Sequence, residues 1–261
     1  MTERRTGRRR EQRQEQMSQF VIARGSATAA DLAEEFAVSV NTIHRDLDDL
    51  ERRGVVRKFH GGVTAQPSGV FETNVAYRLR QMVPEKQQVA RQAARFVEPG
   101  MSILLDDSTT ALQLIPHLAE RTPLKVVTNY QEAMHRLSAI DGISLLGLGG
   151  EYDNQHDAFL GVMCLQCIDA IRVDACFIST SAARGADAYH QEERVVAFKR
   201  AMLDSAARRY LLLDHTKLEK VALHRLVPLS TFDAVVVDSG ASEAALADLR
   251  QYQVPYEVAE A

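Results

Sequence analysis

Residues 28–62 read TAADLAEEFAVSVNTIHRDLDDLERRGVVRKFHGG, and this stretch predicts two short helices followed by a glycine-tipped hairpin. The first helix is predicted to begin at Thr28, whose hydroxyl is a good N-cap. Asp31, three residues later, can complete a capping box by accepting a hydrogen bond from the Thr28 amide. Leu32 and Phe36 follow at the spacing of one apolar helix face. The local pattern therefore indicates a short first helix.

A second helix is predicted after a brief interruption of the apolar period. Ser39 offers another N-cap, with Thr42 at the third helical position. Ile43, Leu47 and Leu50 then fall on one apolar stripe. Two short helices in immediate succession are typical of a helix-turn-helix unit.

The residues after the second helix predict a small basic wing. Gly54 is the predicted C-cap of the helix. Residues 55–59 alternate in the manner of a strand, and Gly61 and Gly62 permit backbone dihedrals that other residues avoid. We therefore expect a hairpin that carries cationic side chains beside the helix pair.

The polar face of the second helix and the wing carry side chains suited to DNA. Hydroxyl, amide, imidazole and guanidinium groups contact base edges or phosphates when a helix N-terminus enters a major groove. The acidic residues of this helix are expected to point away from the duplex or to pair with Arg52 and Arg53. The predicted DNA-binding residues are Ser39, Val40, Asn41, Thr42, His44, Arg45, Arg57, Lys58 and His60.

Residues 38–62 resemble the DeoR family of bacterial transcription regulators. The heads of that family carry the pattern VSxxTIRRDLxxLExxGxxxRxHGG, and this chain reads VSVNTIHRDLDDLERRGVVRKFHGG. His44 stands where the family usually has an arginine. The resemblance implies a winged helix-turn-helix that binds a double-stranded DNA operator.

Length and charge indicate that the chain consists of a small N-terminal head and a larger second domain. The chain has 261 residues, 46% of them hydrophobic, which is enough for two domains with buried cores. The net charge is −4, but residues 1–66 hold 12 Lys and Arg against 10 Asp and Glu, a charge of +2, and the remainder carries −6. The expected parts are a basic arm (1–16), the winged helix-turn-helix (17–63), a linker (64–83) and an effector domain (84–261).

The basic arm has two open interpretations. Its first 13 residues contain six arginines, which can neutralise DNA phosphates in a salt-dependent manner. The same composition is also typical of a disordered, solvated tail.

The sequence predicts a cytoplasmic protein without a membrane partner. No apolar run approaches the roughly 20 residues that span a bilayer, and no apolar segment follows the basic N-terminus. Cys164 and Cys167 form a C-x-x-C, but no second pair completes a zinc site. We expect these two cysteines to be buried packing residues and not a metal or redox pair, and we expect no metal and no cofactor.

The remainder of the chain alternates helices with buried strands. Such alternation predicts an α/β domain with a mainly parallel sheet covered on both faces. Helices are expected from Pro84, from Thr109, through Met134, over the C-x-x-C segment and from about Glu192 to Ala207. The predicted strands are MSILLD, KVVTN, ISLLGLGG, DACFIST, RRYLLLD and DAVVVDS.

Polar residues follow five of these strands, and they predict a ligand site. In a parallel sheet, ligands bind beyond the carboxyl ends of the strands. Hydroxyls and free amides suit a phosphate or carboxylate, whereas Asp and Asn suit sugar hydroxyls. Each cluster alone is also consistent with a helix cap or a turn. The predicted effector-binding residues are Asp106, Asp107, Ser108, Thr109, Thr110, Thr128, Asn129, Gly149, Gly150, Ser179, Glu192, Asp214 and Lys217.

From Glu85 to about Ser239 the chain also resembles the effector domain of the DeoR family. The matching motifs are Glu85-Lys86, Val127-Thr128-Asn129, Gly149-Gly150, Gly161, Lys199 to Met202 and Asp214 to Lys217. The resemblance implies the fold of ribose-5-phosphate isomerase and glucosamine-6-phosphate deaminase, and a phosphorylated sugar as the favoured effector. The family loop D-S-G-T-T is here D-D-S-T-T, so Asp107 adds a negative charge where a phosphate would bind. Beside a helix N-terminus, Asp107 could itself interact with the helix dipole.

Two classes of function fit these patterns. The first is a repressor of carbohydrate-metabolism genes whose operator binding responds to a sugar phosphate or related polyol; an activator would share every sequence feature. The second is a sugar-phosphate isomerase or deaminase fused to a DNA-binding domain, with Asp106, Glu192, Glu193 and Lys217 as candidate groups for proton transfer. No extended catalytic motif supports the enzyme. A homo-oligomer is expected, because one short helix buries too little groove surface for tight binding.

Overall fold

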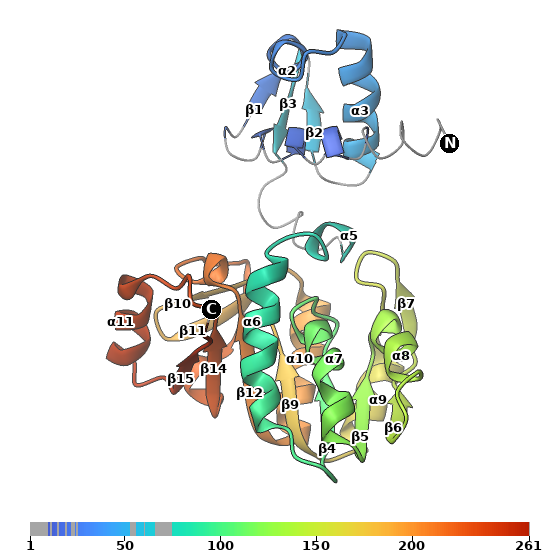
Figure 1. Cartoon of the computed structure of the whole chain (residues 1–261), viewed down its shortest axis with the longest axis vertical. Helices are drawn as coiled ribbons and strands as arrows, with labels where there is room; N and C mark the ends of the chain where they lie inside the picture. Colours follow the sequence, from blue (N-terminus) through green and yellow to red (C-terminus); the bar gives the residue numbers. More distant parts are fainter. Residues whose placement is uncertain are drawn as a thin grey trace. The chain divides into compact units, whose positions relative to one another are not determined.

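The computed structural model divides the chain into two compact units, residues 1–74 and 75–261 (Figure 1). The structure describes residues 81–260 continuously, and before them residues 10, 12–14, 16–18, 20, 21, 24, 26–52, 56–59, 61–65 and 75–80. The predicted C-cap Gly54 and the predicted wing residue His60 lie outside the described residues, as does the side chain of Arg57.

The first unit is a winged helix-turn-helix, as the sequence predicts. Helix α2 (Ala29–Glu35) begins at the capping box of Thr28 and Asp31, and helix α3 (Val40–Arg52) follows it. The Ser39 hydroxyl accepts a hydrogen bond from the Thr42 amide at 3.2 Å, so the second predicted N-cap is also confirmed. Strands β1 (Ser26–Thr28), β2 (Val56–Phe59) and β3 (Gly62–Ala65) form an antiparallel sheet in the order β1-β3-β2.

The turn of the wing depends on Gly61. This residue joins β2 to β3 with a φ of +88°, a conformation that L side chains rarely adopt. The hairpin that results pairs Phe59 with Gly62 and Val56 with Ala65. β3 therefore extends two residues into the range expected to be linker.

The second unit is built on a parallel sheet of seven strands, which confirms the predicted fold class. The strand order is β15-β14-β12-β9-β4-β5-β6, and every neighbouring pair is parallel. The bounds of these strands are β4 Ser102–Leu105, β5 Leu124–Thr128, β6 Ile143–Gly147, β9 Val173–Ile178, β12 Ala206–Leu213, β14 Ala234–Val237 and β15 Tyr256–Val258.

Helices cover both faces of this sheet (Figure 1). One buried cluster joins side chains of α6, α7 and α8 to strand residues such as Ile103 and Phe177. The other joins side chains of α9, α10 and α11 to strand residues such as Leu104 and Cys176. Successive residues of one strand thus enter opposite cores, as the pleat requires. The bounds are α6 Val83–Ala93, α7 Ile115–Leu118, α8 Gln131–Leu137, α9 Val162–Asp169, α10 Glu193–Ser205 and α11 Glu243–Gln251.

The helix predicted from Thr109 differs from expectation. A 3-10 turn (Ala111–Leu114) comes first, then the single turn of α7, then a second 3-10 turn (Ala119–Arg121). Pro116 lies in the first turn of α7 and has no amide hydrogen to donate to Leu112, so a continuous α-helix cannot form through it.

Several elements were not predicted from the sequence, among them α11 and β15 of the second unit. A short helix, α5 (Val75–Arg78), lies within the range expected to be linker. Strands β7 (Glu151–Asp153) and β8 (Ala158–Leu160) form an antiparallel hairpin. Strands β10 (Ala182–Arg184), β11 (Asp187–His190) and β13 (His224–Pro228) form a small antiparallel sheet. In the part of the chain that the structure describes, no helix is long and apolar enough to cross a membrane.

Candidate functional site

The outer face of α3 presents the predicted DNA-reading side chains to solvent. Ile43, Leu47 and Leu50 are buried, whereas His44 and Arg45 are exposed. Val40 and Asn41 are exposed as well, and Val40 keeps 43% of its surface accessible. The hydroxyls of Ser39 and Thr42 lie 2.9 Å apart and form a hydrogen bond with each other. The apolar stripe and the polar face of α3 are thus arranged as the helical period predicts.

The acidic residues of α3 are neutralised within the head. Asp46 is buried and pairs with Arg10 at 3.3 Å and with Arg13 at 2.7 Å. Asp49 pairs with Arg10 and with Arg52, so the predicted partnership with Arg52 is confirmed for this carboxylate. Arg53 lies outside the described residues. Two arginines of the predicted basic arm therefore lie against α3, where they compensate its negative charge.

The wing residue Lys58 also forms contacts within the head. Lys58 forms an ion pair with Asp48 at the other edge of α3. Its backbone amide donates a hydrogen bond to the Glu51 carboxylate at 2.9 Å. A phosphate contact from Lys58 would have to compete with Asp48, and the proposed role of Lys58 stays a prediction.

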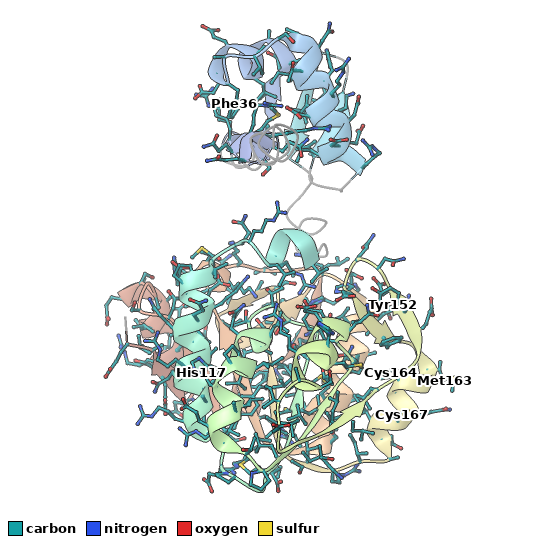
Figure 2. All side chains as sticks on the ribbon, turned by 45° about the vertical axis from the view of Figure 1, so that its right-hand side comes forward. Phe36, His117, Tyr152, Met163, Cys164 and Cys167 are labelled. Atoms are coloured by element: carbon teal, nitrogen blue, oxygen red, sulfur yellow. The ribbon has the colours of Figure 1, made fainter. Side chains whose placement is uncertain are left out.

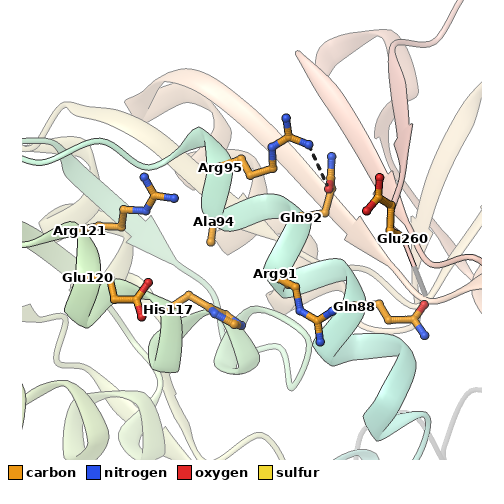
Figure 3. Close-up of a pocket in the computed structure, with 9 residues that line it drawn as sticks. All are labelled: Gln88, Arg91, Gln92, Ala94, Arg95, His117, Glu120, Arg121 and Glu260. Atoms are coloured by element: carbon orange, nitrogen blue, oxygen red, sulfur yellow. Dashed lines mark hydrogen bonds between the residues drawn. The ribbon is translucent and has the colours of Figure 1, made fainter.

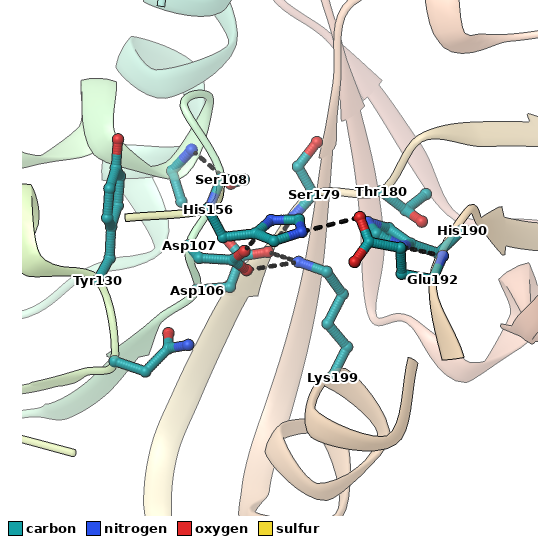
Figure 4. Close-up of polar contacts among 12 residues, drawn as sticks. Asp106, Asp107, Ser108, Tyr130, His156, Ser179, Thr180, His190, Glu192 and Lys199 are labelled. Atoms are coloured by element: carbon teal, nitrogen blue, oxygen red, sulfur yellow. Dashed lines mark hydrogen bonds and ion pairs between the residues drawn. The ribbon is translucent and has the colours of Figure 1, made fainter. Parts of the chain in front are cut away.

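In the second unit, Asp106 anchors the ends of two strands. This carboxylate follows β4, is fully buried, and accepts hydrogen bonds from the amides of Ser108 at 3.0 Å and Ser179 at 2.9 Å. Its third partner is the ammonium of Lys199, which extends from the middle of α10 (Figure 4). Asp106 therefore joins the end of β4, the end of β9 and the centre of α10.

Asp107 continues this network in the opposite direction. Its carboxylate lies 3.3 Å from Lys199 and 3.1 Å from Nδ1 of His156, a residue of the β7–β8 turn. The other ring nitrogen of His156 lies 2.9 Å from the Glu192 carboxylate at the start of α10 (Figure 4). We call Asp106, Asp107, His156, Glu192 and Lys199 the strand-end cluster.

The cluster shifts the pKa values of its members toward the charged forms. Burial alone would raise the pKa of Asp107, but Lys199 and His156 hold it well below its usual value. Burial alone would lower the pKa of His156, but hydrogen bonds to Asp107 and Glu192 raise it to about 9. Lys199 also has a raised pKa, because Asp106 and Asp107 outweigh its burial. His156 is therefore an imidazolium at neutral pH, held between two carboxylates.

Four buried polar atoms beside this cluster have no hydrogen-bond partner among the residues described. They are Thr110 Oγ1, Asn129 Oδ1, the Tyr130 hydroxyl and Arg78 Nε. Thr110, Asn129 and Tyr130 are fully buried at the ends of β4 and β5. Arg78 donates to the Asp107 carbonyl at 3.4 Å, which places the guanidinium at the cluster. A buried polar atom without a partner is costly, so these atoms are candidates for contact with a ligand.

Other predicted effector residues have partners within the protein. The Ser108 hydroxyl accepts from the Ala111 amide at 3.0 Å, and the Thr128 hydroxyl accepts from the Tyr130 amide at 3.1 Å. Lys217 donates to the Ser179 hydroxyl at 3.0 Å and lies 3.9 Å from the buried Asp214. These residues shape the strand ends.

The two predicted glycines do not belong to the contact network. Gly149 and Gly150 are exposed. A Cβ on Gly150 would lie 2.5 Å from the Leu160 carbonyl, so this glycine permits the close approach of β7 and β8. Glu193, a candidate for proton transfer, is exposed in the first turn of α10. The interaction of Asp107 with the helix dipole is not found, because Ser108 caps the turn and Asp107 pairs with Lys199.

Sequence reasoning missed several residues of the site. Lys86 donates to the Thr109 hydroxyl at 3.0 Å and to the Arg78 carbonyl at 2.6 Å. Lys86 and Lys199 both lie in motifs that match the family, and these motifs were the signal in the sequence that could have identified them. His156 and Arg78 lie in segments without such a motif, and only the folded chain shows their role.

The expectation that Cys164 and Cys167 are both buried is wrong for Cys167. Cys164 and Cys176 are buried, but Cys167 is exposed one turn of α9 later (Figure 2). The buried face of this helix takes Cys164 and Ile168, and Cys167 falls outside that stripe. Burial raises the pKa of Cys164 to about 12, so its thiol is not poised to ionise. Within the described residues, no group of His, Cys, Asp or Glu side chains is arranged to hold a metal ion.

A polar groove of about 360 Å³ lies elsewhere on the second unit (Figure 3). Arg91 of α6 and Arg95 of the 3-10 turn that follows it (Ala94–Phe96) line the groove, together with His117, Arg121 and Glu260. Its lining includes no residue of the strand-end cluster. Its arginines are partly offset by Glu120 and Glu260.

The fold and the two sites define a DNA-binding transcriptional regulator with a separate sensor domain. Residues 13–68 match the family model of the DeoR-like helix-turn-helix domain, and residues 81–239 match that of the DeoR C terminal sensor domain. The chain therefore belongs to the DeoR family, which confirms the resemblance found in its sequence.

Named relatives match over most of their length. The chain is 30% identical to the uncharacterized HTH-type transcriptional regulator YgbI of Escherichia coli K12, covering 90% of this chain and 92% of that protein. It is 28% identical to the glycerol-3-phosphate regulon repressor of the same organism, covering 87% and 90%. Among solved structures, ribose 5-phosphate isomerase A of Methanocaldococcus jannaschii matches with a TM-score of 0.37 and 18% identity over 53% of each chain.

Arg45→Ala is expected to weaken binding to the operator by about 1 to 3 kcal/mol and to relax preference at one base position, because Arg45 is exposed on the DNA-reading face. Arg52→Ala is the matched control, since Arg52 is also exposed but pairs with Asp49. Fluorescence anisotropy with operator variants measures both. An equal loss of operator affinity in the two variants would contradict a contact between Arg45 and a base.

Stability should fall as pH rises from 6.5 to 9 through His156. The raised pKa means that the folded state holds this proton more tightly than the unfolded state. The resulting contribution, up to about 3 kcal/mol, is complete below pH 6.5 and lost as pH rises through about 9.

Chemical unfolding of the full chain at pH 6.5 and pH 9 tests this effect. His156→Gln should reduce the difference between the two pH values, while His135→Gln, at an exposed position, should not. The same pH dependence in wild type and His156→Gln would contradict the assignment.

Proposed function

We propose that this protein is a repressor of carbohydrate-related genes whose operator binding changes when a small hydroxylated, sugar-derived ligand occupies the strand-end cluster. The single observation that carries the proposal is the group of four buried, unpartnered polar atoms beside charged residues that are themselves paired. Buried polar groups without partners near the carboxyl ends of parallel strands are typical of a ligand site. The name of the glycerol-3-phosphate regulon repressor supports the carbohydrate assignment.

The cluster has a direct route to the start of the sensor domain. Arg78 contacts the Asp107 carbonyl and lies 3.5 Å from His156. It belongs to α5, the first element of the second unit along the chain. A ligand that engages Arg78 Nε therefore acts on the segment that follows the DNA-binding unit in sequence. Coupling of this kind requires that the ligand bind the two states of the segment with different affinity.

The same geometry favours sensing over catalysis. Asp106 accepts three hydrogen bonds, and Glu192 is paired with His156, so neither carboxylate is a free base.

Prolonged incubation of the purified protein with aldose and ketose phosphates is therefore expected to give no interconversion of the two sugars. A measurable conversion that Asp106→Asn abolishes would favour the isomerase alternative.

The ligand response should depend on the unpartnered side chains. An operator is first selected from random DNA with the full-length protein, and small sugars and polyols are then screened for their effect on its binding. Asn129→Ala and Tyr130→Phe should abolish the response while DNA affinity without ligand stays unchanged, because both side chains lie in the sensor domain.

Arg121→Ala is the control for this experiment, since Arg121 lines the separate groove. This variant should respond like wild type. A response that survives in Asn129→Ala and is lost in Arg121→Ala would move the effector site to the groove.

We expect the protein to bind its operator as a dimer or a larger oligomer. Only one face of α3 is available to the major groove in each chain, and paired half-sites double the contacts. Sedimentation at micromolar concentration, with and without operator, measures the state. A monomer under both conditions, on a selected operator without repeated half-sites, would contradict this expectation.

A further inference from the structure

Asp107 distinguishes the strand-end cluster from an ordinary anion site. Its carboxylate is buried to 1% exposure and faces the two cationic groups of Lys199 and His156. Arg78 adds a third cation, which donates to the Asp107 backbone carbonyl. Three positive groups thus converge on a position that a side chain of the protein already fills with negative charge.

The cations that meet Asp107 have further anionic partners. Lys199 also pairs with Asp106, and His156 also pairs with Glu192. The cluster therefore contains three carboxylates against Lys199 and His156, with Arg78 beside them. A dianionic phosphate placed here would lie close to at least two buried carboxylates, and poorly screened like charges repel strongly at such distances.

The unpartnered atoms also fit hydroxyl groups better than phosphate. Asn129 Nδ2 donates to the Phe159 carbonyl at 2.9 Å, which fixes Asn129 Oδ1 as an acceptor. Arg78 Nε is a donor, and the hydroxyls of Thr110 and Tyr130 can each donate and accept. A sugar hydroxyl can donate to Asn129 and accept from Arg78. A fully ionised phosphate has no hydrogen to donate to Asn129 Oδ1.

We infer that the Asp107 carboxylate is an internal counter-ion that excludes phosphate from the strand-end cluster, so that the effector is a polyhydroxylated compound without a phosphate group. This inference rests on the proposed function for the location of the effector site. It makes Asp107 the residue that determines ligand class, and it assigns Thr110, Asn129 and Tyr130 to hydroxyl recognition.

The decisive experiment creates a phosphate site by removing the counter-ion. The melting temperature of the full-length protein is measured at pH 6.5 in about 10 mM inorganic phosphate. The reference is a chloride solution of equal ionic strength that contains neither phosphate nor sulfate. Wild type should not be stabilised. Asp107→Ser should gain about 3 °C or more, because Lys199 and His156 then lack one anion.

Two further variants keep this test interpretable. Asp107→Asn retains the shape of the side chain and should show the same gain if Asp107→Ser folds poorly. Asp187→Ser is the matched control, since it removes a carboxylate that pairs with Arg225 at 2.7 Å outside the cluster. This control should gain nothing from phosphate.

The inference is overturned if phosphate stabilises wild type as much as the Asp107 variants, or if neither Asp107 variant gains more than Asp187→Ser. Paired ligands extend the test: ribose, glucitol and glycerol are each compared with their phosphates. Asp107→Ser should improve the affinity for the phosphorylated member at least about tenfold relative to its partner. Failure of the proposed function has a different signature, in which Asn129→Ala leaves the operator response intact.

Discussion

The buried pair of Asp106 and Lys199 is the interaction on which the sensor site depends. Asp106 follows β4, and its carboxylate holds the amides of Ser108 and Ser179, while Lys199 reaches it from α10. Neither ion is accessible to water, so each requires the other. Removing one partner of such a pair typically costs about 3 to 5 kcal/mol, because the remaining charge stays buried. The strand-end loop is therefore placed by electrostatics as much as by the sheet.

A second set of charged contacts joins this anchor to the β7–β8 turn and to α5. His156 connects the β7–β8 turn with Glu192 at the start of α10, and Arg78 connects α5 with Asp107. These contacts lie between elements that are far apart in sequence and near one edge of the sheet. A ligand that satisfies the unpartnered atoms of Tyr130 and Arg78 would add to a network that already spans α5, β4 and α10.

The sequence predicts those features that local chemistry determines. The caps at Thr28 and Ser39 and the apolar stripe of α3 follow from spacing over a few residues, and the structure confirms them. The strands were predicted because their apolar runs are continuous, and the polar strand ends followed from the rule for parallel sheets. The roles of Lys199 and His156 could not be predicted in this way. Lys199 is 93 residues from Asp106, and His156 lies in a turn without a family motif. Two local predictions also failed. Pro116 interrupts the helix predicted from Thr109, and Cys167 lies on the exposed face of α9.

Charge counting alone would misjudge both units for the same physical reason. The acidic residues of α3 would seem to oppose DNA, yet Asp46 and Asp49 are compensated by Arg10, Arg13 and Arg52. In the sensor domain, Lys199 and His156 are both buried cations, yet each is paired with two carboxylates of the same cluster. In each unit, internal ion pairs neutralise charges that a count of residues would leave uncompensated. What remains for recognition is the set of groups that the protein leaves unpaired, and these are the groups that decide which ligand can bind.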